Sequence, residues 1–169
     1  MHIERLHEQH KVHGFFSGNT QLDYWLQNYA VENQARDISR TFVLVDDEEI
    51  VGYYSLTMGG LRSEQLPAQI GRGLPHIEIG MVLIGRLAIG SMYQRQGYGR
   101  DLLIDAISRA VHAGSQVAAR FIAVDPIDDS ARNFYSHFGF MTIHGDEFKR
   151  MFLRMDETLS ALNLSLIHI

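Results

Sequence analysis

The sequence predicts an α/β protein with a mixed central sheet and helices on both of its faces. The apolar run 77–89 precedes a glycine-containing turn, a helical apolar pattern over 99–112 and a second apolar run over 117–124. A strand–helix–strand unit of this kind is normally parallel and right-handed. Upstream, the β-branched and aromatic segments 41–45 and 50–58 flank an acidic turn, which predicts a hairpin. The length of 169 residues fits one domain with a sizeable core.

Composition excludes several classes of protein. Hydrophobic residues make up 46% of the chain and charged residues 21%, values typical of a globular protein. We expect no membrane span, because no apolar run is long enough, and no secretory signal at the N-terminus. The chain has no cysteine, which excludes disulfides, thiolate metal sites and a cysteine nucleophile. We therefore expect a cytoplasmic protein.

The net charge of −5 argues against a surface that is basic throughout, as many nucleic-acid-binding proteins have. The charge is unevenly distributed, because residues 1–60 hold 4 of the 15 basic residues and 9 of the 20 acidic ones. Any basic patch is therefore expected in the later part of the chain.

The N-terminal part predicts an amphipathic helix after a turn at 17–20. Thr20 and Asp23 resemble a capping box. The apolar face of this helix is formed by Leu22, Trp25, Leu26, Tyr29 and Ala30. The segment 59–76, which contains several glycines and prolines, is expected to be irregular.

In the C-terminal part, Gly114 is a candidate C-cap for the 99–112 helix. Asp128 or Asp129 is the expected N-cap of another helix, and its apolar face holds Ala131, Phe134, Tyr135 and Phe138. Strands are expected over 140–144 and 148–154, around a Gly145-Asp146 turn. We expect residues 1–155 to form the domain and 156–169 a tail.

His7, His10 and His13 are spaced by three residues, a spacing that places metal ligands on one face of a helix. The chain has no HExxH motif, and no carboxylate pattern of that kind is nearby. We interpret these histidines as solvated and predict no metal site.

A phosphate-binding turn is predicted between the run Leu87–Ile89 and the following helix. The amides at a helix start point outward and the helix dipole favours anions there. Glycines let a pyrophosphate approach the backbone, and arginines add charged hydrogen bonds. The residues expected to contact the pyrophosphate are Gln94, Arg95, Gln96, Gly97, Tyr98, Gly99 and Arg100. The turn matches neither the Walker pattern nor a complete GxGxxG fingerprint, and an ordinary strand–helix connection remains the alternative.

The string RLAI, a short turn and QxxGxG resembles the acetyl-CoA pyrophosphate loop of the GCN5-related N-acetyltransferase (GNAT) family. A second motif, ARNFYSHFGF at 131–140, is similar to the other signature of that family and lies one strand downstream. The resemblance implies a single GNAT-type domain, with a strand–pyrophosphate loop–helix core, that binds acetyl-CoA.

Most of residues 14–155 looks like one branch of the family, the acetyltransferase toxins of bacterial toxin–antitoxin pairs. The segment SGNTQLDYWLQNYAVENQ favours this branch, since it lies outside the general GNAT signature. The resemblance implies a homodimer, a ribbon-helix-helix antitoxin as partner, and acetylation of the α-amine of aminoacyl-tRNA, which blocks translation.

Acetyl transfer needs an acid for the departing thiolate and donors that orient the thioester. Tyr135 is the candidate acid, because a phenol with a pKa of about 10 can donate to a thiolate with a pKa near 8.5. Backbone N–H groups of Leu87, Ala88 and Ile89 are expected to orient the pantetheine arm. Asn133 and Phe138 are also expected at the cofactor; the alternatives are a solvated helix residue and a core residue.

A general base is not evident, because no carboxylate occurs over 79–84 and Glu78 lies at the far end of the strand. An α-amine with a pKa of about 7.7–8.0 is partly neutral at pH 7, whereas a lysine amine near 10.4 needs far more help. This difference favours an α-amine acceptor, unless a base comes from segment 59–76 or from a partner subunit.

Three functions remain open from the sequence. The first is acetylation of aminoacyl-tRNA; the second is acetylation of a small amine or a protein N-terminus; the third is a non-catalytic acyl-CoA-binding module. Binding of tRNA would require a local basic groove, for which the candidates are Arg86, Arg132, Lys149, Arg150 and Arg154.

Overall fold

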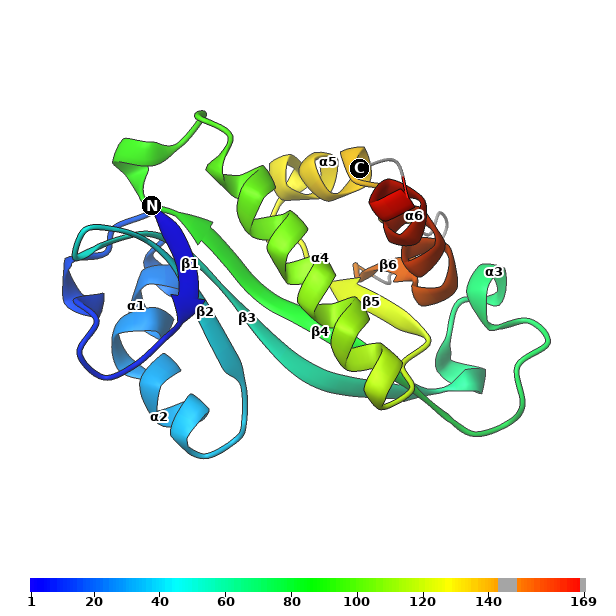
Figure 1. Ribbon diagram of the computed structural model, residues 1–169. Helices are drawn as coiled ribbons and strands as arrows, with labels where there is room; N and C mark the ends of the chain where they lie inside the picture. Colours follow the sequence, from blue (N-terminus) through cyan, green and yellow to red (C-terminus); the bar gives the residue numbers. More distant parts are fainter. Residues whose placement is uncertain (143–148, 168–169) are drawn as a thin grey trace. The chain divides into compact units, whose positions relative to one another are not determined.

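The computed structural model describes residues 1–142 and 149–167, with side chains described up to residue 161. Its strands form one sheet in the order β1-β2-β3-β4-β5-β6 (Figure 1). The strands are β1 (His2–Arg5), β2 (Arg40–Asp46), β3 (Glu49–Arg62), β4 (Glu78–Ile89), β5 (Phe121–Val124) and β6 (Met151–Arg154). The β1–β2, β2–β3 and β5–β6 pairs are antiparallel, so the hairpin expected over 41–58 is confirmed.

The helices alternate with these strands and confirm the predicted α/β class. The α-helices are α1 (Thr20–Asn28), α2 (Ala30–Ala35), α3 (Ala68–Gly71), α4 (Tyr98–Gln116), α5 (Asp129–His137) and α6 (Met155–Ile167). Three short 3-10 helices are η1 (Val12–Gly14), η2 (Ser63–Gln65) and η3 (Ser91–Tyr93). In the part of the chain that the structure describes, no helix has the length and apolar character that crossing a membrane requires.

The chain divides into two compact units. Residues 1–57 and 84–108 form the first unit, and residues 58–83 and 109–169 form the second. β3 and β4 each contribute one half to each unit, because the division falls within both strands.

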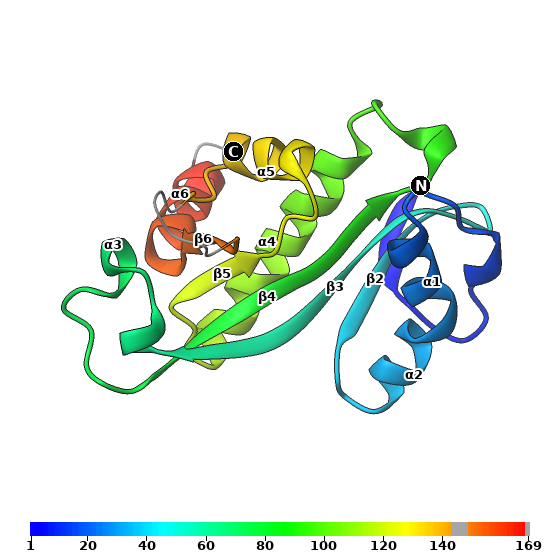
Figure 2. The same ribbon diagram turned by 180° about the vertical axis from the view of Figure 1, so that it is seen from behind.

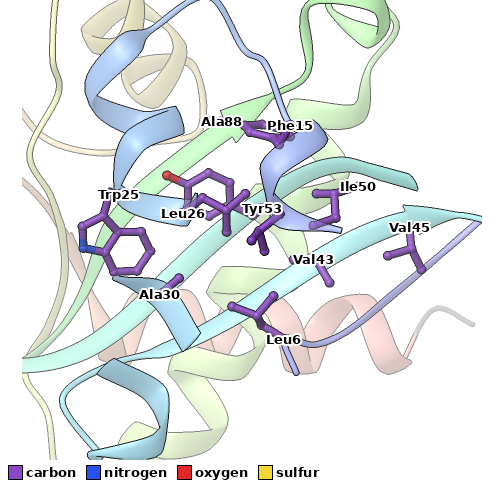
Figure 3. Close-up of a cluster of buried hydrophobic side chains, with 11 residues drawn as sticks. Leu6, Phe15, Trp25, Leu26, Ala30, Val43, Val45, Ile50, Tyr53 and Ala88 are labelled. Atoms are coloured by element: carbon purple, nitrogen blue, oxygen red, sulfur yellow. The ribbon is translucent and has the colours of Figure 1, made fainter. Parts of the chain in front are cut away.

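Helices cover both faces of the strands in the first unit. Figure 2 shows α1 and α2 following one another along the same side of these strands. The core on that side contains Trp25, Leu26 and Tyr53 together with aliphatic residues of β1, β2 and β4 (Figure 3). On the other face, the ring of Phe42 stacks on Tyr54 at 5.3 Å. The prediction of helices on both faces therefore holds for this unit, because the Tyr54 hydroxyl bonds a side chain of α4.

The second unit has its own core between β4, β5 and β6. Phe121 of β5 meets Phe152 of β6 edge to face, with ring centroids 5.6 Å apart. Buried Leu66, Ile79 and Met81 belong to the same cluster. The segment 59–76 is therefore less irregular than expected. β3 extends through Arg62, and η2 and α3 follow it, because Leu66 anchors this segment in the core.

The start of α1 differs from the prediction. The N-cap is Asn19, whose side chain accepts a hydrogen bond from Leu22 N at 3.0 Å, and Thr20 is already the first helical residue. Asp23 is buried and accepts hydrogen bonds from the backbone N and the hydroxyl of Ser17. The capping-box interpretation is wrong, because Asp23 fixes the incoming chain instead of closing a box with Thr20.

Gly114 does not cap α4, since that helix continues to Gln116. A Cβ at Gly114 would lie 2.7 Å from Met155 Cε. Glycine at this position therefore permits close packing of α4 against the first residue of α6, which explains why the C-cap prediction is wrong. The expected tail is also largely helical, as α6 begins at Met155.

The remaining C-terminal predictions are confirmed in part. Asp128 caps α5, accepting a hydrogen bond from Ala131 N at 2.7 Å. Of the strands expected over 140–144 and 148–154, the structure shows β6 and an isolated antiparallel bridge between Met141 and Phe152. The expected Gly145-Asp146 turn lies outside the described residues.

Candidate active site

The predicted phosphate-binding turn forms an open loop between β4 and α4. Two of its residues have a left-handed backbone, Arg95 with φ 63° and Gly97 with φ 90°. A Cβ at Gly97 would meet no protein atom within 4 Å. The backbone bond from Asp101 N to Gly97 O, at 3.2 Å, is the first of the helical pattern. The preceding amides of Tyr98, Gly99 and Arg100 therefore have no acceptor within the helix and are available to an anion.

Side chains of this loop divide into two kinds. Gln96 donates to Met92 O at 3.2 Å, and the Tyr98 ring contacts the Tyr93 ring at 6.3 Å. Arg95 and Arg100 are exposed and are engaged in no ion pair within the part of the chain that the structure describes. Their guanidinium groups are therefore free to meet phosphate oxygens, and the loop fits a pyrophosphate.

Gln94 holds the loop in place through its side-chain amide. Its Nε2 donates to Ser17 O at 2.7 Å and to Ile89 O at 2.9 Å. Two backbone bonds support the same turn, from Gly90 N to Val51 O and from Ser91 N to Phe16 O, each 2.8 Å long. The geometry thus gives the Gln94 amide a positioning role, whereas the sequence had suggested contact with the cofactor.

The run expected to orient the thioester arm forms the last three residues of β4. Ala88 is buried in the core below α1, while Leu87 and Ile89 are half-buried. Glu78, the nearest acid upstream, is exposed at the first residue of the same strand. The acid and the loop are therefore at opposite ends of β4, as expected from the sequence.

Tyr135, the candidate acid, lies on α5 in the second unit and is only 7% exposed. Its ring contacts Phe134 at 5.3 Å and Phe140 at 5.5 Å. Burial, aided by the negative charge of Asp125, raises the pKa of Tyr135 to about 12. Within residues 1–142 and 149–161 its hydroxyl has no hydrogen-bond partner. A buried phenol that is protonated and unpaired is suited to donate to a bound ligand.

The other two cofactor candidates on this helix differ in their surroundings. Asn133 is exposed. Phe138 is half-buried and contacts the rings of Phe134 at 5.1 Å and His137 at 5.4 Å. Phe138 therefore belongs to an aromatic cluster at the end of α5, whereas Asn133 is open to solvent.

Most of the candidate basic groove is already paired. Arg150 makes a two-point ion pair with Asp125, at 2.8 and 2.9 Å, and Arg154 pairs with Asp156 at 3.1 Å. Arg132 donates to Lys149 O at 2.9 Å, so these two residues do come together. Charge on Arg150 and Arg154 is thus largely compensated, which weakens their case as phosphate ligands.

Arg86 is different, and the sequence gave no sign of its partner. Its guanidinium carbon lies 4.2 Å from the centroid of the Trp25 ring, a cation–π contact. The Trp25 ring in turn stacks on Tyr53 with centroids 6.0 Å apart and 13° between the planes. The two aromatic residues come from α1 and β3, so no local motif could have revealed this stack.

The structure also shows a hollow of about 370 Å³ in the first unit. Its lining includes Lys11, Phe15, Phe16, Glu49, Ser91 and Tyr93. Glu49 accepts a hydrogen bond from the Tyr93 hydroxyl at 3.4 Å. No motif in the sequence indicated this hollow, because its walls come from three separate segments.

Glu4, His7 and His10 come close enough to resemble a metal site, with ligand atoms within 4.8 Å of one another. Nδ1 of His10 accepts a bond from His7 N, and Nδ1 of His7 accepts one from Gln9 N. Both neutral rings therefore carry their proton on Nε2, and Nε2 of His10 lies 2.7 Å from a Glu4 oxygen. This arrangement satisfies the histidines by hydrogen bonds and leaves no lone pair on Nε2 for a metal.

Comparison with known proteins identifies the family. Residues 5–140 match the family model described as "Acetyltransferase (GNAT) family". The chain belongs to the GNAT acetyltransferase family. It is 35% identical over 152 residues to the tRNA-acetylating toxin of Mycobacterium tuberculosis, which covers 90% of this chain and 91% of that protein.

Solved structures of AtaT have the same fold as this GNAT chain. AtaT complexed with acetyl-methionyl-tRNAfMet has a TM-score of 0.84 at 24% identity, covering 95% of this chain and 98% of that one. A tyrosine-to-phenylalanine mutant of AtaT, bound to the C-terminus of the antitoxin AtaR and acetyl-CoA, has a TM-score of 0.80 at 23% identity, covering 95% and 97%. The predicted family, α/β fold and N-acetyltransferase class are thus confirmed.

Proposed function

We propose that this GNAT protein is an acetyl-CoA-dependent toxin that acetylates the α-amine of aminoacyl-tRNA and thereby blocks translation. The observation that carries the proposal is the 35% identity, over 90% of the chain, to a protein whose described activity is tRNA acetylation. Action on aminoacyl-tRNA would place the protein in the cytoplasm.

The loop between β4 and α4 holds the pyrophosphate of acetyl-CoA in this proposal. The amides of Tyr98, Gly99 and Arg100 supply uncharged donors, and Gly97 leaves open space in front of them. Arg95 and Arg100 add charged hydrogen bonds, and Gln96 lies among them. Leu87, Ala88 and Ile89 orient the pantetheine arm through their backbone. The bound cofactor supplies the acetyl group as an activated thioester.

Tyr135 is the proton donor of the reaction in this proposal. With its pKa raised to about 12, it stays protonated at every physiological pH. Complete transfer of its proton to a thiolate with a pKa near 8.5 is uphill, so its main role is a hydrogen bond to the developing negative charge on sulfur. Phe134 and Phe140 fix the ring that presents this hydroxyl. Asn133 and Phe138 remain proposed cofactor contacts from the same helix.

The acceptor enters as a neutral amine. An aminoacyl α-amine is substantially neutral near pH 7.5, so it can attack without a dedicated protein base, and water removes the proton afterwards. Exposed Glu78, at the far end of β4 from the loop, fits this interpretation. A lysine side-chain acceptor would need a base that lowers its pKa by several units.

An antitoxin partner follows from the same proposal, since AtaT has been solved with the antitoxin AtaR. We propose that the partner here is of the ribbon-helix-helix class and that the toxin is a homodimer. Residues 1–155 form the catalytic domain in this proposal. Co-expression with the adjacent small reading frame, followed by size-exclusion chromatography with light scattering, tests both the partner and the dimer.

The direct test of function is a purified translation system with and without acetyl-CoA, beside the variant Tyr135→Phe. We expect arrest only with acetyl-CoA, relief by fresh aminoacyl-tRNA, and loss of arrest in the variant. Undisturbed translation together with measurable acetyl-CoA binding would contradict the proposal. It would direct the search to small amines, protein N-termini or a non-catalytic acyl-CoA-binding role.

A further inference from the structure

Arg86 is a half-buried cation without a protein acceptor. Within residues 1–142 and 149–161, its guanidinium makes neither an ion pair nor a hydrogen bond. Burial removes water from this cation and lowers the pKa of Arg86. The other half-buried arginines in that part of the chain all have partners: Arg40, Arg109, Arg132, Arg150 and Arg154. Arg86 thus bears the desolvation cost of burial without a compensating bond.

The protein nevertheless fixes this guanidinium in one place. It lies over the Trp25 ring, and Trp25 stacks on Tyr53, whose hydroxyl is tied to Leu22 O at 2.7 Å. Trp25 is 8% exposed and Tyr53 is fully buried, so the stack is rigid. Stacking holds the guanidinium by its face and leaves its five edge N–H groups, which form the planar fork suited to a phosphate, free to bind a ligand.

Arg86 also lies next to the residues assigned to the thioester. It directly precedes Leu87–Ile89 on β4, and the Ala88 side chain belongs to the same core cluster as Trp25. The guanidinium therefore lies on the α1 side of the strand that positions the acetyl group. An anion held there would belong to a molecule whose amine approaches the end of β4.

We propose that Arg86 binds the phosphate of the 3′-terminal nucleotide of the acceptor RNA and so selects aminoacyl-nucleotide substrates. This inference rests on the proposed function. In an aminoacyl ester the carboxylate of the amino acid is consumed in the bond to ribose. The nearest anion to the reactive amine is then the 5′-phosphate of the terminal adenosine. A guanidinium fork binds phosphate through two parallel charged hydrogen bonds.

The experiment compares two small acceptors that differ only in that phosphate. Both are 3′-aminoacylamino-3′-deoxyadenosines, which resist hydrolysis; one carries a 5′-phosphate and the other a 5′-hydroxyl. We expect the wild-type protein to show a kcat/KM about tenfold or more higher for the phosphorylated compound, in the range that one charged hydrogen-bonded contact provides. Arg86→Gln should reduce this ratio to about one, and Arg86→Lys should restore part of it.

Three measurements separate recognition from a structural role. Arg86→Gln should keep the acetyl-CoA KM and the kcat for the 5′-hydroxyl compound within about twofold. Its melting temperature should stay close to that of the wild type, because the cation has no bonded partner to lose. The exposed Arg5, replaced in Arg5→Gln, is the matched control and should keep the full substrate preference.

Two results would overturn the inference in different ways. If the wild type acetylates aminoacyl-tRNA but does not prefer the phosphorylated compound, or if Arg86→Gln keeps the preference, Arg86 does not bind that phosphate and the proposed function stands. If the wild type acetylates neither aminoacyl-tRNA nor either compound, the proposed function itself fails and the inference fails with it.

Discussion

The side-chain amide of Gln94 donates a hydrogen bond of 2.7 Å to the backbone carbonyl of Ser17, 77 residues earlier in the chain. This bond ties the pyrophosphate loop to the segment that enters α1. The same segment is fixed by Asp23, which binds both the backbone N and the hydroxyl of Ser17. The loop is thus shaped by the α1 entry as well as by its own glycines.

Gln94→Ala should loosen the loop, because it removes the bonds to Ser17 O and Ile89 O. At about 0.5–1.5 kcal/mol for each bond, we expect the free energy of unfolding to fall by about 1–3 kcal/mol. The acetyl-CoA KM should rise several-fold with little change in kcat. Urea denaturation and initial-rate kinetics measure the two effects. The exposed Gln21, replaced in Gln21→Ala, is the control, and equal behaviour of the two variants would refute the tether.

Gly97→Ala should raise the acetyl-CoA KM through the backbone alone. Gly97 has φ 90°, a conformation that costs an L-residue about 1–2 kcal/mol, and its Cβ would meet no atom within 4 Å. The matched control is Gly14→Ala, which also has open space but no left-handed φ. Calorimetric titration with acetyl-CoA should show weaker binding for Gly97→Ala only. Unchanged affinity would mean that the loop does not need this conformation to bind the cofactor.

The pH dependence of the reaction should reflect the raised pKa of Tyr135. The rate should increase with pH as the acceptor amine loses its proton, with an apparent pKa of about 7.7–8.0. A phenol with an ordinary pKa would lose its proton near pH 10 and end the plateau there. Because burial raises the pKa of Tyr135 to about 12, the donor form persists and the plateau should extend beyond pH 10. Stopped assays with the hydrolysis-resistant acceptor measure this, and a fall centred near pH 10 would contradict it.

Tyr135→Phe should lower kcat about a hundredfold or more, the range typical of a positioned proton donor. The acetyl-CoA KM should change little, because the ring contacts with Phe134 and Phe140 remain. Any residual activity should keep the amine-dependent limb of the pH profile. A variant with wild-type kcat would exclude Tyr135 as the donor and leave water or a backbone group in that role.

The hydrogen bond from the Tyr54 hydroxyl to Asp105 Oδ2, 2.5 Å long, links β3 to α4 beneath the loop. Tyr54→Phe should reduce the free energy of unfolding by about 1.5–3 kcal/mol, since the bond joins a buried phenol to a carboxylate. Asp105→Asn retains an acceptor oxygen and should cost less. Urea denaturation of both variants tests the order, and a Tyr54→Phe variant as stable as the wild type would show that this link contributes nothing.

Local patterns predicted the elements of this fold well, and long-range contacts explain where they did not. The β2–β3 hairpin and the Asp128 cap depend on neighbouring residues and could be derived from the sequence. Gly114 was misassigned because its partner, Met155, belongs to another helix. The Arg86–Trp25 contact joins β4 to α1, and neither residue occurs in a motif that would suggest it.

The candidate site divides in the same way. The glycines and arginines of the loop could be recognised from their spacing, because a helix start binds anions through its own backbone. The tether of Gln94 and the unpaired state of Tyr135 depend on which residues surround them in space. Those surroundings change the role of Gln94 from ligand to positioning residue, and they raise the pKa of Tyr135 beyond its ordinary value.

The central claim, acetylation of the aminoacyl α-amine on tRNA, is tested most directly by mass spectrometry of the product. Charged tRNA is incubated with the protein and acetyl-CoA, digested with ribonuclease, and the 3′-terminal aminoacyl-adenosine is weighed. The account predicts a mass increase of one acetyl group on that fragment, with the acetyl on the α-nitrogen, and no increase with Tyr135→Phe. Unmodified aminoacyl-adenosine in the presence of active, acetyl-CoA-binding protein would contradict it.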